Sequence, residues 1–263
     1  MHFETLKLTQ DENNTGVFTI TLDRQAALNA LNTQMALDLI KALNFLEKSV
    51  EVKVLILTGA GKKSFCVGAD LKERKNMSDN DWEKQHNIFE EAYLALRAFP
   101  LPTICAINGY ALGGGLELAL SCDFRLISET ATVGLPEAKI GIIPGSGGTQ
   151  LLPRIIDLGA AKELLFTGEH IEASRALSLR VVNHISKPDY LIKETNKKAY
   201  KISNNAPLSL KSIKKSVDTG IHTDLNTGIS IEIAQYYRCA YSEDRREGVL
   251  AFNEKRSPRW VNK

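Results

Sequence analysis

The chain has 263 residues, of which 43% are hydrophobic and 24% are charged. This is the composition of a globular protein that buries a sizeable core, in one large domain or two small ones. Lys and Arg number 33 against 31 Asp and Glu, a net charge of +2, so the overall charge favours neither a nucleic acid nor an acidic membrane surface as a partner.

Cysteine usage and hydropathy indicate the compartment. Cys66, Cys105, Cys122 and Cys239 are widely spaced and form no Cys-x-x-Cys pair, which is typical of reduced thiols in the cytosol. The first residues lack the apolar stretch of a signal peptide, and no apolar segment is long enough to span a bilayer. The five histidines show no metal-ligand spacing. We therefore expect a cytoplasmic protein without a membrane segment or a bound metal.

The first hundred residues predict strands and helices in alternation. The run at 52–57 is apolar at nearly every position, as in a strand that is covered on both faces of its sheet. Asn32 or Thr33 is suited to cap one helix, and Ser78 with Asp81 resembles the capping box of another. The predicted elements are strands at 3–9, 16–22 and 52–57, with a turn at 11–16, and helices at 32–49 and 78–99.

The middle of the chain contains the candidate chemistry. Thr103–Ile107 predicts a buried strand, and the triplet Gly113–Gly115 then opens an apolar helical run. Glycines let a ligand approach the backbone closely, and the free N–H groups of a helix N-terminus favour negative charge. Glu117 follows the triplet among apolar neighbours, and Glu137 comes twenty residues later, before a second glycine cluster at 145–148.

Each of these features also fits a structural role. Glycine triplets serve tight packing, and a glutamate is electrostatically favoured in any first helical turn. Glu137 by itself fits an ordinary loop position. The combination of two carboxyl groups and a backbone anion site in an apolar setting favours an active site.

Helices predominate in the remainder of the chain. Strands that alternate with helices, followed by a run of helices, predict an α/β core with a helical C-terminal part, divided at residues 1–200 and 201–263. The predicted helices are 147–156, 160–166, 172–179, 189–203, 207–219, 224–240 and 242–255, with one short strand at 181–185.

Several separated segments resemble the enoyl-CoA hydratase/isomerase (crotonase) family. They are Phe65-Cys-Val-Gly-Ala-Asp-Leu71, Ile107-Asn-Gly-Tyr-Ala-Leu-Gly-Gly-Gly-Leu-Glu-Leu118, and Leu135-Pro-Glu137 with Gly141-Ile-Ile-Pro-Gly145 and Gly148-Thr-Gln150. The similarity begins at Leu22-Asp-Arg24 and ends at Phe252-Asn-Glu-Lys-Arg256, nearly the whole chain. Agreement at several segments is far more specific than a single glycine motif.

The resemblance implies a crotonase-like spiral of ββα units followed by C-terminal helices that build trimers, often paired into hexamers. It implies an acyl-CoA thioester as substrate, as in fatty acid metabolism, with no cofactor. The N–H groups of Ala69 and Gly114 would form the oxyanion hole, and Glu117 and Glu137 match the two glutamates of the hydratases. The positions that match CoA contacts are Ala27, Leu28, Ala69, Asp70, Leu71, Lys72, Gly114, Phe252 and Lys255.

The chemistry of hydration agrees with this assignment. Adding water to a conjugated thioester puts negative charge on the carbonyl oxygen, and one preorganised N–H donor is worth roughly 10²–10³ in rate. The water needs a base and Cα needs a proton, so two positioned carboxyl groups share the work, each contributing on the order of 10²–10⁴. We therefore expect a hydratase that converts a 2-enoyl-CoA into the 3-hydroxyacyl-CoA.

Three further expectations remain open. The segments Asp70-Leu-Lys-Glu-Arg74 and 115–120 look like the methylglutaconyl-CoA hydratase branch, which favours 3-methylglutaconyl-CoA or another short enoyl-CoA. An isomerase of the same family, which normally relies on one carboxylate, is the nearest alternative. Some members of that branch bind AU-rich RNA, and the basic segment Lys72–Lys75 is the local argument for an RNA-binding protein. The near-neutral net charge makes nucleic acid the weaker expectation.

Overall fold

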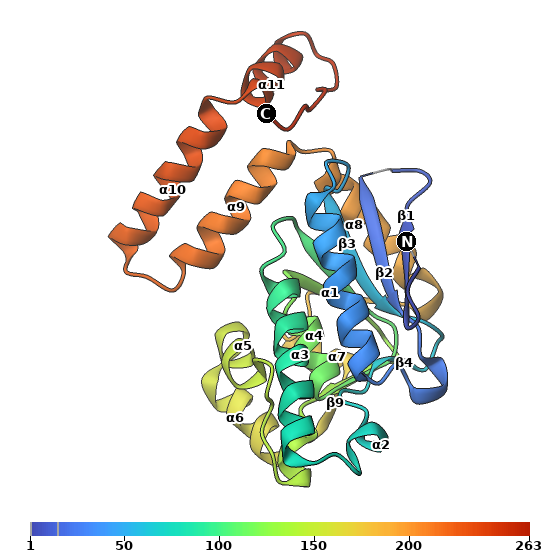
Figure 1. The fold of residues 1–263 in the computed structure, drawn as a ribbon. Coiled ribbons are helices and arrows are strands. Elements are labelled where there is room, and N and C mark those ends of the chain that lie inside the picture. The colour runs from blue at the N-terminus through green and yellow to red at the C-terminus, as the bar shows by residue number, and fades with distance from the viewer. Residues whose placement is uncertain (1, 15) are drawn as a thin grey trace.

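The computed structural model describes residues 2–14 and 16–263, which form two β-sheets (Figure 1). Thr15, within the predicted turn at 11–16, lies outside the described residues. The larger sheet has the strand order β1-β2-β3-β5-β7-β10, and the smaller sheet has the order β4-β6-β8-β9. The strands are β1 (Leu6–Gln10), β2 (Val17–Leu22), β3 (Val54–Gly59), β4 (Ser64–Cys66), β5 (Thr103–Ile107), β6 (Tyr110–Leu112), β7 (Phe124–Ser128), β8 (Thr132–Gly134), β9 (His170–Glu172) and β10 (His184–Ser186).

The chain passes from the larger sheet to the smaller one three times in succession. β3 is followed by β4, β5 by β6 and β7 by β8, and helices follow each pair. The strand pairs among β2, β3, β5 and β7, and among β4, β6 and β8, are parallel, whereas the edge strands β1 and β9 pair antiparallel. This repetition is the spiral of ββα units that the sequence analysis predicts.

The helices begin where the sequence places capping groups. The Asn32 side chain accepts a hydrogen bond from the N–H of Met35, and Ser78 accepts one from the N–H of Asp81. The helices are α1 (Thr33–Lys48), α2 (Leu71–Arg74), α3 (Asp79–Arg97), α4 (Gly114–Leu120), α5 (Gly148–Ile155), α6 (Leu158–Thr167), α7 (Ala173–Ser178), α8 (Leu191–Ser203), α9 (Pro207–Gly220), α10 (Leu225–Ala240) and α11 (Glu243–Asn253). Short 3₁₀ turns lie at η1 (Gln25–Ala27), η2 (Pro136–Ile140) and η3 (Pro188–Tyr190).

Both faces of the larger sheet are covered, as the apolar run at 52–57 predicts. Leu55 and Leu57 of β3 belong to the main core with residues of α1 and α3. Val54 and Ile56 point the other way, into a second cluster that α8 covers. Because side chains alternate along a strand, a run that is apolar at every position can serve two cores at once.

Two strand predictions need correction. The sequence analysis assigns no strand at 124–128, where β7 lies in the larger sheet. The charged Arg125 interrupts the apolar pattern of this segment, but its buried guanidinium donates to the carbonyls of Ala119, Cys122 and Val181. The strand predicted at 181–185 is displaced, because pairing with β7 begins only at His184. The strands β6, β8 and β9 have three residues each, too few to show a periodic signal.

The last three helices form an arm that extends away from the two sheets (Figure 1). α10 contains no buried residue along its whole length. The expected domain boundary after residue 200 falls in the last turn of α8, which still packs on the larger sheet, and the arm begins at Pro207. The division into a core and a helical region remains a proposal.

Candidate active site

Glu117 projects from the first turn of α4 and is 3% exposed. Its Oε1 accepts hydrogen bonds from the backbone N–H groups of Ser146, at 2.8 Å, and Gly148, at 2.7 Å. The second glycine cluster of the sequence therefore wraps around this carboxyl group. Burial raises the pKa of Glu117, and the two N–H donors oppose that rise by favouring the charged form.

Glu137 belongs to η2 and is 8% exposed. Its carboxyl group lies beside Gly113, the residue that precedes α4. Its Oε1 is 2.9 Å from the point where a Cβ on Gly113 would lie, so a side chain at position 113 would displace it. Its buried Oε2 accepts no hydrogen bond from the described residues. Burial, together with the charge of Glu117, raises the pKa of Glu137 to about 7. The structure thus brings together the two predicted glutamates, one well hydrogen-bonded and the other short of partners.

The two predicted N–H donors also lie next to each other. A Cβ on Gly68 would be 3.1 Å from the N of Gly114, and a Cβ on Gly114 would be 3.8 Å from the N of Ala69. Leu31 holds the Ala69 segment in place, because its N–H donates to Gly68 and its carbonyl accepts from Asp70. Within the described chain, neither the N–H of Ala69 nor that of Gly114 donates to a protein acceptor.

Tyr93 of α3 is a site residue that the sequence analysis missed. Its hydroxyl donates to the carbonyl of Gly114 at 2.7 Å, and its ring is 2% exposed. A Cβ on Gly114 would lie 2.6 Å from this hydroxyl oxygen, so the close approach requires glycine. An aromatic residue on the apolar face of a helix usually belongs to the core, and only the choice of Tyr over Phe signals a polar partner.

The loop that precedes α1 has two successive residues in the left-handed backbone conformation. Leu28 and Asn29 both have positive φ, 52° and 56°, a conformation that costs energy for residues other than glycine. Asn29 donates to the carbonyls of Ala60 and Ser64, and the Ser64 hydroxyl donates to the carbonyl of Leu28. These bonds hold the loop and leave Leu28 38% exposed.

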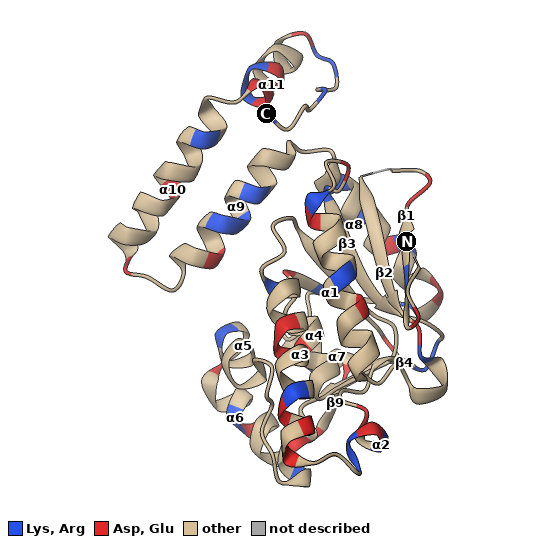
Figure 2. Ribbon diagram, in the orientation of Figure 1, with Lys and Arg blue, Asp and Glu red and all other residues tan. Residues whose placement is uncertain are grey.

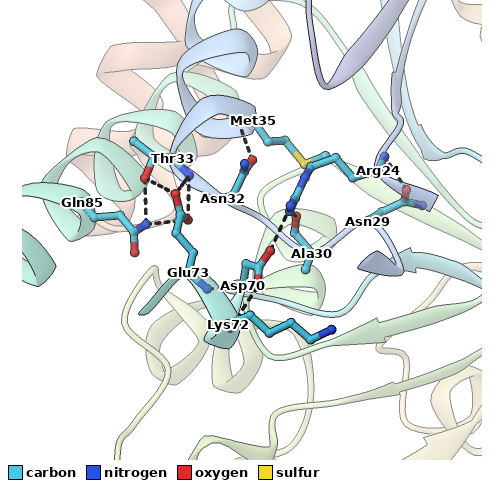
Figure 3. A network of polar contacts seen from close by, with 10 residues as sticks. All are labelled: Arg24, Asn29, Ala30, Asn32, Thr33, Met35, Asp70, Lys72, Glu73 and Gln85. Atoms are coloured by element: carbon cyan, nitrogen blue, oxygen red, sulfur yellow. Dashed lines mark hydrogen bonds and ion pairs between the residues drawn. The ribbon is translucent and has the colours of Figure 1, made fainter. Parts of the chain in front are cut away.

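Asp70 is directed to structural partners, as Figure 3 shows. It forms an ion pair with Arg24 at 3.0 Å. It also caps α2, because its side chain accepts a hydrogen bond from the N–H of Lys72. Arg24 also donates to the carbonyl of Ala30 at 2.6 Å. Leu71 is 56% exposed, and Lys72 is exposed as well. Asp70 therefore supports the backbone around the start of α2, while the two residues after it face solvent.

Phe252 and Lys255 lie apart from the other predicted contacts. Phe252 belongs to α11 and is 83% exposed, and Lys255 follows that helix with φ at 54°. Figure 1 shows α11 at the far end of the arm, away from α2. A single chain therefore does not bring these two residues to Ala69 or Leu28.

Other site types find little support in the described part of the chain. Among residues 2–14 and 16–263, no group of three or more His, Cys, Asp or Glu is placed to hold a metal ion. In the same ranges, none of the helices combines the length and apolarity that crossing a membrane requires.

Comparison with known proteins decides the family. A sequence model described as enoyl-CoA hydratase/isomerase matches residues 12–263. The chain belongs to the enoyl-CoA hydratase/isomerase family. The short-chain-enoyl-CoA hydratase of Clostridium acetobutylicum is 39% identical over 240 residues, which cover 91% of this chain and 92% of that protein. The crotonyl-CoA hydratase of Syntrophomonas wolfei is 36% identical over 263 residues and all of both chains.

Solved structures of the family have the same fold. The crystal structure of an enoyl-CoA hydratase from Bacillus anthracis has a TM-score of 0.96 at 38% identity, over 99% of this chain and 100% of that one. The predictions of family and fold, and of an enoyl-CoA hydratase enzyme, are confirmed. The methylglutaconyl-CoA branch is not distinguished by these relatives and stays a prediction.

Proposed function

We propose that this enzyme adds water to a 2-enoyl-CoA thioester and forms the 3-hydroxyacyl-CoA. One observation carries the proposal. Two buried glutamates, one that accepts two backbone N–H bonds and one with an unpartnered carboxyl oxygen, lie beside two adjacent, unused backbone N–H groups. Hydration needs a base, an acid and an oxyanion site in one place, and this arrangement supplies all three.

The environments of the two carboxyl groups suggest their roles. Glu117 accepts two N–H bonds, which favour its charged form, and serves as the base for water. Glu137, with its pKa raised to about 7, holds a proton near neutral pH and serves as the acid. The division therefore rests on the difference in hydrogen bonding, since Oε1 of Glu117 accepts two backbone N–H bonds while Oε2 of Glu137 accepts none from the described residues.

The reaction then balances as follows. Water oxygen bonds to Cβ while one of its protons passes to Glu117, and the Cα–Cβ electron pair moves toward the thioester. The negative charge on the carbonyl oxygen is met by the N–H groups of Ala69 and Gly114. Cα then takes the proton of Glu137. Both side chains regain their starting protonation when a proton returns from Glu117 to Glu137 after product release.

The remaining predicted contacts fit a CoA groove along α2. In this proposal Ala27 and Leu28 supply one wall of the groove and the 69–72 segment supplies the other. The ion pair of Arg24 with Asp70 supports the second segment. Phe252 and Lys255 reach a groove only if a second copy presents its arm to it. We therefore propose a homotrimer or hexamer in which α9–α11 join subunits and cover the CoA groove, in the cytoplasm. The arm supports this, since α10 buries none of its apolar residues within the chain.

Two alternatives are less well supported. An isomerase can work with one carboxylate, whereas this chain keeps both, buried and electrostatically coupled. RNA binding through 72–75 would have to do without Arg74. The guanidinium of Arg74 donates to Gln85 and lies over the rings of Trp82 and Phe89. Figure 2 shows both signs of charge on α2.

The test of the proposed reaction is spectroscopic. Loss of the conjugated thioester absorbance should be followed across crotonyl-, longer 2-enoyl- and 3-methylglutaconyl-CoA, with product identified as the 3-hydroxyacyl-CoA. A short or branched acyl group should give the highest kcat/KM. Double-bond migration without water addition would assign the enzyme to the isomerases.

A further inference from the structure

One face of α3 contacts the backbone that builds the site. His86, Tyr93 and Arg97 are spaced by seven and four residues, which places them on the same face of the helix. Tyr93 reaches the start of α4. A Cβ on Gly145 would lie 2.8 Å from Cε1 of His86, and a Cβ on Gly147 would lie 3.2 Å from Nη1 of Arg97. His86 and Arg97 therefore lie against the loop at 145–148, whose N–H groups bind the carboxyl group of Glu117.

This loop has little support of its own. Among the described residues, no backbone hydrogen bond involves residues 143–145. Ile143 is 71% exposed. The N–H groups of Ser146 and Gly148 point inward to Glu117. The carbonyl of Gly147 accepts hydrogen bonds from the N–H groups of Gln150 and Leu151 in α5, which hold the end of the loop. Beside Gly145, the support comes from His86 of α3.

The imidazole of His86 is itself held firmly. It stacks on the Trp82 indole with 5.0 Å between ring centroids and 11° between planes, and its Nε2 is 3.2 Å from Glu90 Oε1. Arg74 of α2 lies over Trp82, with its guanidinium carbon 5.3 Å from the ring centroid. The ring of His86 thus contacts Trp82, which packs against Arg74 of α2, on one side, and Gly145, in the loop at 145–148, on the other.

We propose that His86 and Arg97 are positioning residues for Glu117. They hold the loop at 145–148 from outside, so that its two N–H groups keep the carboxylate ready to accept a proton from water. The inference rests on the proposed role of Glu117 as the base. Neither side chain touches the substrate in this scheme, and both act through the glycines they contact.

The first experiment truncates the imidazole. In His86→Ala the loop should move and weaken the N–H bonds to Glu117, which raises the pKa of a buried carboxylate. The acid limb of kcat/KM should therefore shift by about one unit to higher pH, as expected for loss of one charge-assisted hydrogen bond. On the acid limb itself kcat should fall by up to about tenfold, with KM changed less than twofold. His86→Phe, which keeps a flat ring against Gly145, should restore the wild-type limb.

A second experiment reverses the contact. In Gly145→Ala the new Cβ collides with the imidazole, and the acid limb should shift as in His86→Ala. In the double variant the space left by the ring accepts the methyl group, so the second substitution should add almost nothing. Arg97→Ala should give a smaller shift in the same direction. The matched control is His184→Ala. His184 is an exposed histidine of β10 that pairs with Glu194 of α8, and its loss should leave the pH profile unchanged.

The outcomes separate the two levels of the argument. If Glu117→Gln retains hydratase activity, the proposed function fails, and this inference fails with it. If Glu117→Gln is inactive but His86→Ala and Gly145→Ala only lower the melting temperature and leave the acid limb in place, the positioning role alone is overturned. Should His86→Ala not fold, His86→Phe and Gly145→Ala still decide the question.

Discussion

The two-sheet core and the helical arm differ in how much of their apolar surface they bury within one chain. In the core, apolar strands are buried on both faces, and the two glutamates are 3% and 8% exposed within one chain. In the arm, Ile229, Ile233 and Tyr237 of α10 are 44–52% exposed on one face. The core buries both proposed catalytic groups within one chain, whereas the arm leaves apolar surface that a single chain does not cover. Chemistry and assembly should therefore respond to different substitutions.

The largest expected effect concerns the chemistry of the core. Glu137→Gln keeps size and polarity but removes the titrating group, so kcat should fall by at least about 10²-fold with KM little changed. Glu117→Gln should behave alike, and the double variant should lose far less than the product, because both groups act on one reaction. Steady-state kinetics with crotonyl-CoA measure this, with light scattering to show an unchanged assembly. A Glu137→Gln enzyme of near wild-type rate would return Glu137 to a loop role.

The arm should respond in the other way. Ile229→Ser with Ile233→Ser places two hydroxyls on the exposed apolar face of α10, a helix on which Figure 2 shows few charged residues. The oligomer should dissociate, and KM should rise several-fold if arms from other copies cover the CoA groove. Light scattering and melting temperature measure the first effect. Ser230→Ala, about a quarter turn away on the same helix, is the control. A wild-type protein that is monomeric at micromolar concentration would refute the assembly proposal.

The pKa of Glu137 gives a pH test that needs no assumption about the arm. Its folded pKa, raised from 4.5 to about 7, contributes stability that is fully present below pH 4.5 and lost as pH rises through about 7. Gln carries no such dependence, so the melting temperature of Glu137→Gln relative to wild type should increase from pH 5 to pH 8. In the wild type, kcat/KM should decline above about pH 7 as the acid loses its proton. A flat difference in melting temperature would contradict the burial argument.

The sequence predicted most of the core for physical reasons that a pattern can express. The run at 52–57, the cap at Asn32 and the alternation of strands with helices depend on local periodicity and capping. Glu117 stood out as a carboxyl among apolar residues, whereas Glu137 was selected through the resemblance of Leu135-Pro-Glu137 to the family; their catalytic roles stay a prediction. β7 was missed because the partners of Arg125 are carbonyls that lie close only in the fold.

The positions of loops and of polar supports could not be predicted in the same way. Tyr93 contacts Gly114 over 21 residues of sequence, and His86 is noted in the sequence only as a histidine without metal-ligand spacing. Their roles come from which backbone lies opposite, and no local spacing encodes that. The separation of Phe252 from the groove likewise depends on the direction in which the arm leaves the core.

The smallest expected effect concerns the pair that supports the groove. Burial opposes ionisation of Asp70, but hydrogen bonds from Arg24 and from two backbone N–H groups outweigh it and lower the pKa of this carboxyl. A depressed pKa contributes stability that is present above the unfolded value, near 4, and is lost as pH falls through the folded one. Asp70→Asn keeps the cap and one acceptor, so unfolding at pH 7 should cost about 1 kcal/mol less than in the wild type.

That loss should appear as a melting temperature about 2–4 °C lower, and the difference should shrink below pH 4, where Asp70 of the wild type becomes protonated. KM for crotonyl-CoA should rise modestly, because Ala69 and Leu71 adjoin the altered residue, while kcat should hardly change. Asp189→Asn is the matched control, since Asp189 lies in η3 and, among the described residues, forms an ion pair only with the exposed Lys62. An equal rise of KM in both variants would show that Arg24 and Asp70 do not support the CoA groove, and that the pair serves the fold alone.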